Sequence, residues 1–225
     1  MSLLNNLTKT NYSSNQVTFS HLFSYGVHKG TTLKMRNAKM DEFLFGYNQN
    51  NDTIFNLDLC TLLLRRAISF LKSVKKEKGQ ILFIGTSGKT QRLTKMLGES
   101  AQQPYIVGRW INGLLTNWEN ISSSIKLYNL FLKKLQLSRK RKANLENSFG
   151  GLCTLNQLPS AIFLLDLKSD GIVINEAKQL GIPIIAFVDN SSDLFDQIDY
   201  PIPMNTGSTF SIFLISSLFL KALKN

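Results

Sequence analysis

A short segment with two glycines is the first place where residue types and spacing could support chemistry. Residues 85–90 read Gly-Thr-Ser-Gly-Lys-Thr and follow an apolar run. A phosphate-binding loop has four residues between its first glycine and its Gly-Lys pair, so that successive backbone N–H groups surround the phosphates. Here only two residues intervene, which is too few for a triphosphate. A helix start beside Lys89 can still hold one phosphate, including a phosphate of an RNA backbone.

Two aspartates are the next candidates for catalysis. Asp166 and Asp189 each follow a predicted parallel strand, and α/β enzymes often carry reactive groups at that position. Turn-forming and helix-capping carboxylates occupy the same positions. Because no base, nucleophile or complete phosphate loop accompanies the two aspartates, we expect them to stabilise turns.

Histidine and cysteine usage argues against a metal or redox site. His21 and His28 lack partners at the required spacing, and we expect both to be helix-surface or loop residues. Cys60 and Cys153 lie in apolar surroundings and form no CxxC pair, so we expect buried, reduced thiols. The sequence therefore predicts no catalytic residue, no metal site and no cofactor.

Positive charge is concentrated in the first two thirds of the 225-residue chain, whose formal net charge is +11. Residues 1–150 hold 22 of the 26 basic and 8 of the 15 acidic residues, a net charge of +14. Residues 151–225 carry a net charge of −3. Such asymmetry favours a polyanionic partner on one part of the molecule.

Four segments contain the basic residues that we predict to bind RNA. We read 27–40, which has four cations and no acid, as an exposed basic loop, and 89–95 as a helix start. Arg109 can pair with phosphate, whereas Trp110 either stacks on a base or is buried under a helical insertion. The predicted RNA-binding residues are Lys29, Lys34, Arg36, Lys39, Lys89, Arg92, Lys95, Arg109, Trp110, Asn112, Asn117, Lys133, Lys134, Arg139, Lys140, Arg141 and Lys142.

Strands and helices must alternate along the chain to position these residues. Apolar spacing predicts strands at 43–47, 53–57, 80–85, 105–107, 161–165, 183–188 and 200–203. Helices are predicted at 17–25, 59–78, 87–100, 170–180 and 208–223, and at 116–147 with an interruption near 137–138. This order predicts an α/β fold, Rossmann-like or flavodoxin-like, with a doubly wound and mainly parallel sheet. We expect 1–115 and 150–225 to form one α/β domain, with 116–149 as an inserted helical hairpin.

Several segments together resemble small-subunit ribosomal protein two, the S-two family, in its bacterial and organellar form. The likeness runs through almost the whole chain from Phe19 to Leu223, although 117–150 is shorter than is usual for the family. The matching segments are 26–30 (GVHKG), 36–40 (RNAKM), 45–46 (FG), 56–59 (NLDL), 81–86 (ILFIGT), 109–118 (RWINGLLTNW), 150–152 (GGL), 158–159 (LP), 176–177 (EA), 180–183 (LGIP), 188–189 (VD) and 199–203 (DYPIP).

The resemblance implies a structural protein of the small ribosomal subunit, bound to small-subunit rRNA beside other ribosomal proteins, without catalysis or cofactor. Asn, Lys and Phe are abundant and Ala is scarce, as AT-rich codons produce, so we expect a mitochondrial ribosome. Two other functions stay open at this point. Gly85, Asp166 and Asp189 would suit a small-molecule or nucleotide-binding enzyme on the same fold, and the cations alone would suit a peripheral membrane protein.

Overall fold

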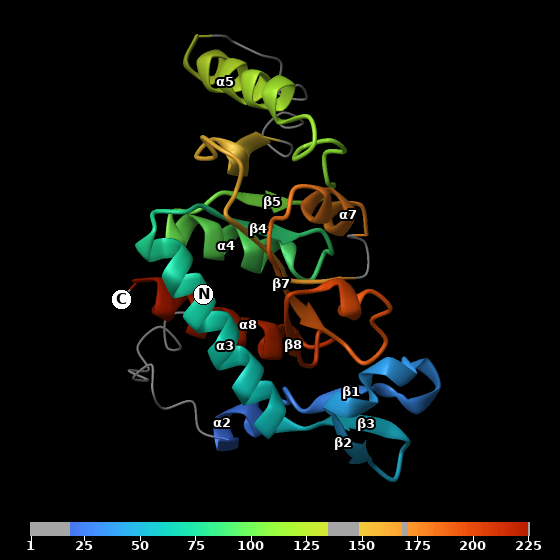
Figure 1. Cartoon of the computed structure of the whole chain (residues 1–225). Helices are drawn as coiled ribbons and strands as arrows, with labels where there is room; N and C mark the ends of the chain where they lie inside the picture. The colour runs from blue at the N-terminus through green and yellow to red at the C-terminus, as the bar shows by residue number, and fades with distance from the viewer. Residues whose placement is uncertain (1–18, 135–148, 168–170, 225) are drawn as a thin grey trace.

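A computed structural model describes residues 19–134, 149–167 and 171–224. Its centre is a parallel sheet of five strands in the order β5-β4-β6-β7-β8 (Figure 1). The strands are Ile81–Gly85 (β4), Tyr105–Val107 (β5), Ala161–Leu164 (β6), Ile184–Val188 (β7) and Tyr200–Pro203 (β8). All five were predicted, and β5 and β8 have the predicted bounds. β4, β6 and β7 are buried at every position, as continuous apolar runs in a sheet covered on both faces require.

Helices cover both faces of this sheet, which makes the fold doubly wound. Alternate side chains of β4 enter different cores: Ile81 and Phe83 face one side, whereas Leu82 and Ile84 face the other. Leu57–Lys76 (α3), Gln91–Ala101 (α4) and Thr209–Lys224 (α8) contribute to the first core. Gly171–Gln179 (α7) contributes to the second. The predicted α/β class, with a Rossmann-like arrangement, is confirmed.

A second, smaller sheet contains two strands that were predicted, at 43–47 and 53–57, and a third strand where we expected an exposed basic loop. Lys29–Thr32 (β1), Leu44–Tyr47 (β2) and Asp52–Phe55 (β3) pair antiparallel in the order β1-β3-β2. Two 3-10 helices connect β1 to β2: Leu33–Met35 (η1) and Ala38–Phe43 (η2). The prediction of a loop over 27–40 was therefore wrong. Local apolar periodicity does not reveal this segment, because its structure depends on partners that are distant in the sequence. One of them is Asn51, whose carbonyl accepts the Leu33 N–H at 2.8 Å.

The remaining described elements are two α-helices and two 3-10 turns. Phe19–Ser24 (α2) precedes the small sheet, while Gly150–Leu152 (η3) and Phe195–Gln197 (η4) are single 3-10 turns. Trp118–Lys134 (α5) lies at the β5 end of the molecule, far from the small sheet (Figure 1). Residues 135–148, where we predicted the rest of the hairpin, lie outside the described part. In the ranges described, no helix combines the length and the apolar character needed to cross a membrane.

Candidate nucleic-acid interface

The four predicted cations of the small sheet are all exposed, but two of them are already neutralised. The Arg36 guanidinium lies 3.0 Å from the Asp41 carboxylate, and the Lys39 ammonium lies 2.9 Å from Asp196. The hydrogen bond from Lys39 lowers the pKa of Asp196 below its ordinary value. Lys29 and Lys34 are in no ion pair with any described residue.

One buried amide fixes the small sheet to the large one. Asn190, which has no exposed surface, is the second residue after β7. Its Oδ1 accepts hydrogen bonds from the Thr31 N–H and hydroxyl, both at 2.9 Å, and its backbone carbonyl accepts the Asn37 N–H at 2.7 Å. Lys34 and Arg36 lie between these two attachment points. They are therefore held beside the carboxyl end of β7.

The turn after β4 places Lys89 at the same edge of the sheet. We predicted that Lys89 begins a helix, but α4 begins at Gln91, so Lys89 lies in the preceding turn. Its ammonium donates to the Gly207 carbonyl, which follows β8, at 3.3 Å. Arg92 and Lys95 are exposed on α4, as predicted, although the Lys95 ammonium lies 3.9 Å from the Glu99 carboxylate.

In the loop after β5, Arg109 and its neighbour Trp110 lie in different surroundings. Arg109 is exposed, as are Asn112 and Asn117. Trp110 is only 8% exposed, and its Nε1 donates to the Glu176 carboxylate at 3.0 Å. Of the two alternatives for Trp110, the structure favours burial, because its indole is part of the core and already has a hydrogen-bond acceptor.

Glu176 is the residue that shapes this loop, and the sequence reasoning did not identify it. The side chain projects from α7 and is 7% exposed. Besides the Trp110 indole, its two oxygens accept backbone N–H groups of Gly113 at 2.8 Å, Leu115 at 3.0 Å and Thr116 at 3.5 Å. The loop that presents Arg109, Asn112 and Asn117 is thus held by a buried carboxylate about sixty positions away in the sequence.

The structure therefore brings part of the predicted set together. Lys89 and Arg109 follow β4 and β5, and the segment with Lys34 and Arg36 is attached at the end of β7. Because the carboxyl ends of parallel strands share one edge of a sheet, these four residues, the carboxyl-edge cations, lie along that edge. The backbones of Lys133 and Lys134 belong to α5, and the predicted residues Arg139 to Lys142 lie outside the described residues.

Two of the candidates for enzymatic chemistry, Gly85 and Asp189, have structural roles. A Cβ at Gly85 would lie 2.0 Å from Thr94 Oγ1, so this glycine lets α4 pack on β4. Asp189 is buried, and its carboxylate accepts the Asn190 N–H at 2.7 Å, which confirms a turn-stabilising role. Over the described ranges, no three His, Cys, Asp or Glu side chains form a group that could hold a metal ion.

One histidine lies in a loop, as predicted, but is buried there. His28 is in the turn between α2 and β1 and is 9% exposed, and its ring stacks on Phe23 with centroids 4.2 Å apart. Burial, and secondarily the charge of Lys29, lowers the pKa of His28. Its Nδ1 has no hydrogen-bond partner among the described residues.

The cysteines agree with the prediction in part. Cys60 is buried, and this burial raises the pKa of its thiol to about 12. Cys153 is half-buried, and burial raises the pKa of this thiol as well. High thiol pKa values suppress the reactive thiolate, so neither cysteine has the character of a nucleophile.

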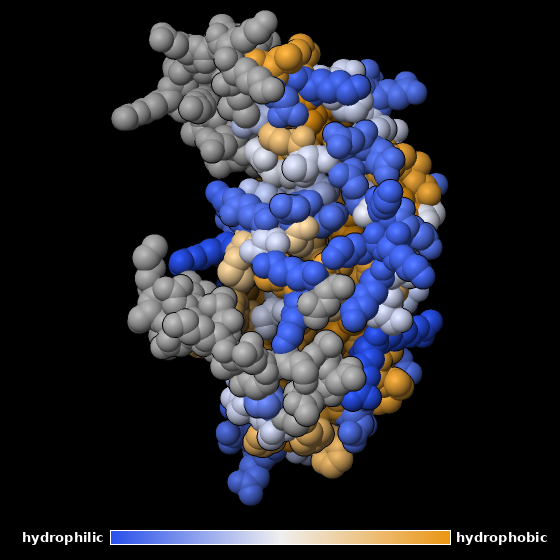
Figure 2. All heavy atoms as spheres, turned by 90° about the vertical axis from the view of Figure 1, so that its left-hand side faces the viewer, coloured by the Kyte–Doolittle hydropathy of each residue, from blue (hydrophilic) through white to orange (hydrophobic). Residues whose placement is uncertain are grey.

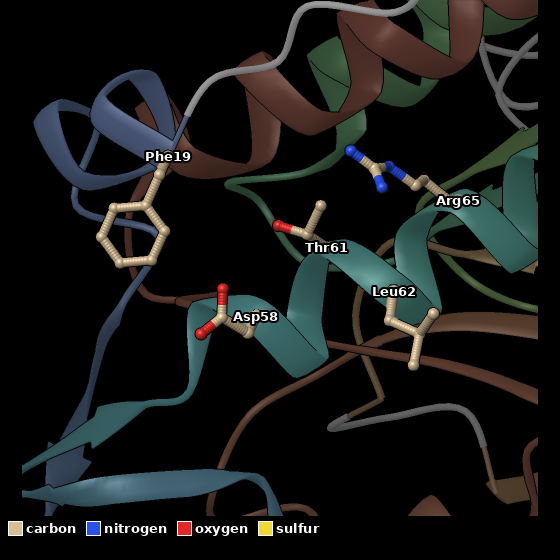
Figure 3. Close-up of a pocket in the computed structure, with 5 residues that line it drawn as sticks. All are labelled: Phe19, Asp58, Thr61, Leu62 and Arg65. Carbon is tan, nitrogen blue, oxygen red and sulfur yellow. The ribbon is translucent and has the colours of Figure 1, made fainter.

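A shallow hollow of about 350 Å³ lies between α2 and α3. Its lining consists of Phe19 from α2 and of Asp58, Thr61, Leu62 and Arg65 from α3 (Figure 3). Gly85, Asp166 and Asp189, the residues proposed for a small-molecule enzyme, are not part of it. Its one carboxylate and one guanidinium offset each other in charge, so it does not resemble a phosphate site.

Comparison with known proteins gives a consistent family assignment. The family described as ribosomal protein S2 matches residues 22–225. The chain is 38% identical over 224 residues to the small ribosomal subunit protein uS2 of Ehrlichia ruminantium (strain Gardel), covering 92% of this chain and 78% of that protein. The uS2 proteins of Marinobacter nauticus and Buchnera aphidicola subsp. Schizaphis graminum are 35% and 34% identical. The match to the Marinobacter nauticus protein covers 88% of this chain and 83% of that protein. The match to the Buchnera aphidicola protein covers 93% of this chain and 91% of that protein. With its parallel α/β sheet and this match over almost its whole length, the chain belongs to the ribosomal protein S2 family.

Proposed function

We propose that this protein is a structural component of a small ribosomal subunit and binds small-subunit rRNA through its predicted basic residues. The observation that carries the proposal is the family match over residues 22–225, together with exposed cations along one edge of the sheet. A ribosomal protein family is a structural rather than an enzymatic one, in agreement with the predicted lack of catalysis.

Phosphate neutralisation provides the physical mechanism. Each Lys or Arg that pairs with a phosphate releases condensed counterions, so RNA affinity falls as salt rises. Lys34 and Arg109 are exposed and in no ion pair with a described residue, which leaves their full charge for RNA. Arg36, Lys39 and Lys95 must exchange a carboxylate for a phosphate, so we expect their contribution to be smaller.

A salt series tests the proposal. The purified chain is sedimented with small subunits that lack it, at about 50 mM and about 200 mM KCl. We expect co-sedimentation at the lower concentration and progressive release at the higher one. In the Lys34→Gln and Arg109→Gln variants, the slope of log affinity against log salt should decrease by about 1 for each cation removed. Binding indifferent to salt and to both substitutions would contradict the proposal.

We also propose that 116–149 is a helical hairpin inserted into an α/β domain of 1–115 and 150–225, and that Lys133, Lys134 and Arg139 to Lys142 contact rRNA from it. The support is α5, a 17-residue helix with cations in its last positions. Replacing 120–146 by a short Gly/Ser linker should leave the unfolding transition of the α/β domain in place and weaken rRNA binding. Loss of the whole transition would contradict the division into domains.

The mitochondrial ribosome is the site of action that we propose, with neighbouring small-subunit proteins as further partners. The support is compositional, since Asn and Lys are abundant as AT-rich codons produce. When the source cells are fractionated, the chain should sediment with mitochondrial small subunits. Nuclease treatment should abolish this sedimentation. Recovery with cytoplasmic or plastid ribosomes would overturn the location but not the function.

A further inference from the structure

Helix α3 carries a row of cations that the sequence reasoning passed over. Arg65, Ser69, Lys72 and Lys76 stand at positions i, i+4, i+7 and i+11, so they lie on one side of the helix. All four side chains are exposed. We call these four residues the α3 stripe. The opposite side of α3 is buried in the core through residues such as Leu64, Ala67 and Leu71.

No cation of the stripe is in an ion pair with a described residue. The three ion pairs in the described ranges involve Arg36, Lys39 and Lys95, and none involves a cation of α3. The α3 helix holds five cations and one acid, Asp58, which lies in its first turn. A cluster of exposed and unpaired like charges raises the free energy of the isolated protein, and a polyanion removes this repulsion.

Two other cations of α3 have internal roles, which separates them from the stripe. The Arg66 guanidinium lies over the Tyr200 ring, 5.6 Å from its centroid. The Lys75 ammonium donates to the Leu223 carbonyl near the end of α8. These contacts explain why Arg66 and Lys75 are present without a ligand. No such contact accounts for Arg65, Lys72 or Lys76.

The layer that contains the stripe is basic, whereas the loop between β7 and β8 on the opposite side is acidic. On the α3 side, α4 and α8 add the exposed cations Arg92 and Lys224. On the α7 side, the segment between β7 and β8 exposes Asp193, Asp196 and Asp199. Figure 2 views the molecule from the left-hand side of Figure 1, where α3 runs, and shows hydrophilic residues in a broad area across the middle of that face. The cations on the α3 side would attract a polyanion.

We propose that the α3 stripe is a second RNA-binding surface, which contacts the phosphate backbone of structured RNA and does not read bases. From Arg65 to Lys76 the helix rises about 16 Å, a length that spans several consecutive phosphates of one strand. The stripe offers ammonium, guanidinium and hydroxyl groups, which suit phosphate oxygens. It contains no aromatic or amide side chain for stacking on a base or reading its edge. This inference rests on the proposed rRNA binding and adds a face to it.

Charge and shape favour RNA over the other polyanionic surfaces. An interfacial membrane helix needs a broad apolar face open to lipid, but the apolar face of α3 is buried against the sheet. The exposed apolar side chains near the stripe, Phe19 and Leu62, stand at its N-terminal end beside the hollow described above (Figure 3). An acidic protein would need carboxylates spaced to match the cations along one side of α3. Binding to such a protein is one outcome of the test.

The test compares salt dependence between faces, with small-subunit rRNA transcribed in vitro as the probe. The double variant Lys72→Gln, Lys76→Gln should bind more weakly, and the slope of log affinity against log salt should decrease by about 2 because two phosphate contacts are lost. Lys178→Gln on α7 is the matched control, since Lys178 is also an exposed helix lysine. It should leave the slope unchanged. Circular dichroism and thermal unfolding verify that each variant folds.

The outcomes separate this inference from the proposed function. Equal slopes for the wild type and the α3 double variant would overturn the second surface, while a reduced slope for Lys34→Gln and Arg109→Gln would still support rRNA binding at the carboxyl edge. If the α3 variant binds free rRNA normally and fails only to join assembled subunits, the stripe faces an acidic protein and the inference is wrong. If no variant at either face changes the slope, the proposed function itself fails.

Discussion

At the scale of single residues, buried polar side chains determine where the loops of this protein lie. Glu176 and Asn190 are both in the core, and each accepts hydrogen bonds from a segment that is remote in sequence. Neither was identified as important from the sequence. The identity of one residue does not reveal which distant N–H groups its oxygen atoms will meet.

Replacement of Glu176 tests its hold on the loop after β5. Glu176→Gln keeps the volume but turns one acceptor oxygen into a donor, which then faces backbone N–H groups. We expect the free energy of unfolding to fall by about 1–3 kcal/mol. Urea unfolding, followed by the fluorescence of Trp110 and Trp118, measures it. Glu119→Gln, at an exposed position, should have little effect, and equal losses for both variants would refute the role of Glu176.

His28 should make stability depend on pH. Its pKa is lowered in the folded protein, so the unfolded chain binds the proton more tightly. Its contribution to stability is therefore complete above about pH 6.5 and is lost as the pH falls below that value. The variant His28→Phe keeps a ring against Phe23 but cannot titrate. It should lose less stability than the wild type between about pH 7 and about pH 5 in urea unfolding. His21→Gln is the control. If the pH dependence of stability in His28→Phe equalled that of the wild type, the role of His28 would be contradicted.

At the scale of helices and strands, the central sheet and two strands of the small sheet could be predicted, whereas β1 could not. The runs at β4, β6 and β7 are apolar throughout, which is the pattern of strands covered on both faces. By contrast β1 reads Lys-Gly-Thr-Thr and has no apolar alternation. Its pairing depends on β3 and Asn190, which local sequence does not show.

The candidate site was predicted in part for the same reason. Exposed cations such as Lys34 and Arg109 could be found by charge alone, because charged side chains seldom lie in a core. The burial of Trp110 depends on Glu176 and was left open by the sequence. The α3 stripe was missed although its spacing of four, three and four residues, starting at Arg65, could have revealed it.

Gly85 at the end of β4 and Gly88 in the turn after it allow a matched pair of substitutions. Gly85→Ala would place a Cβ 2.0 Å from Thr94 Oγ1 and force α4 away from β4, whereas a Cβ at Gly88 meets nothing within 4 Å. We expect Gly85→Ala to lower the free energy of unfolding by about 1–3 kcal/mol and Gly88→Ala to leave it nearly unchanged. Thermal unfolding checks both. If Gly88→Ala were the more damaging change, the packing role of Gly85 would be wrong.

At the scale of the whole molecule, the protein consists of two sheets that share a small polar junction. The hydrogen bonds of Asn190 with Thr31 and Asn37 join them, while Met40 and Phe55 extend the core of the large sheet into the small one. The carboxyl-edge cations draw on both parts. Their relative placement therefore depends on this junction.

Asn190→Ala should loosen the junction before it unfolds the large sheet. It removes the acceptor of two Thr31 hydrogen bonds in a fully buried place, at a cost of about 1–3 kcal/mol. We expect amide hydrogen exchange to quicken first over 29–55 and only later over β4, β6 and β7. Asn156→Ala, at an exposed position, is the control. Uniform acceleration across both sheets would contradict a separate junction.

The strand order has a consequence for the growing polypeptide. In the sheet β5-β4-β6-β7-β8, strand β4 has β5 on one side and β6 on the other, although β6 is made long after both. A nascent chain that has emerged only through β5 therefore carries an open apolar edge at β4, the kind of edge that invites aggregation. Until translation passes Leu164, that edge needs a temporary cover, and a molecular chaperone is the natural candidate to provide it.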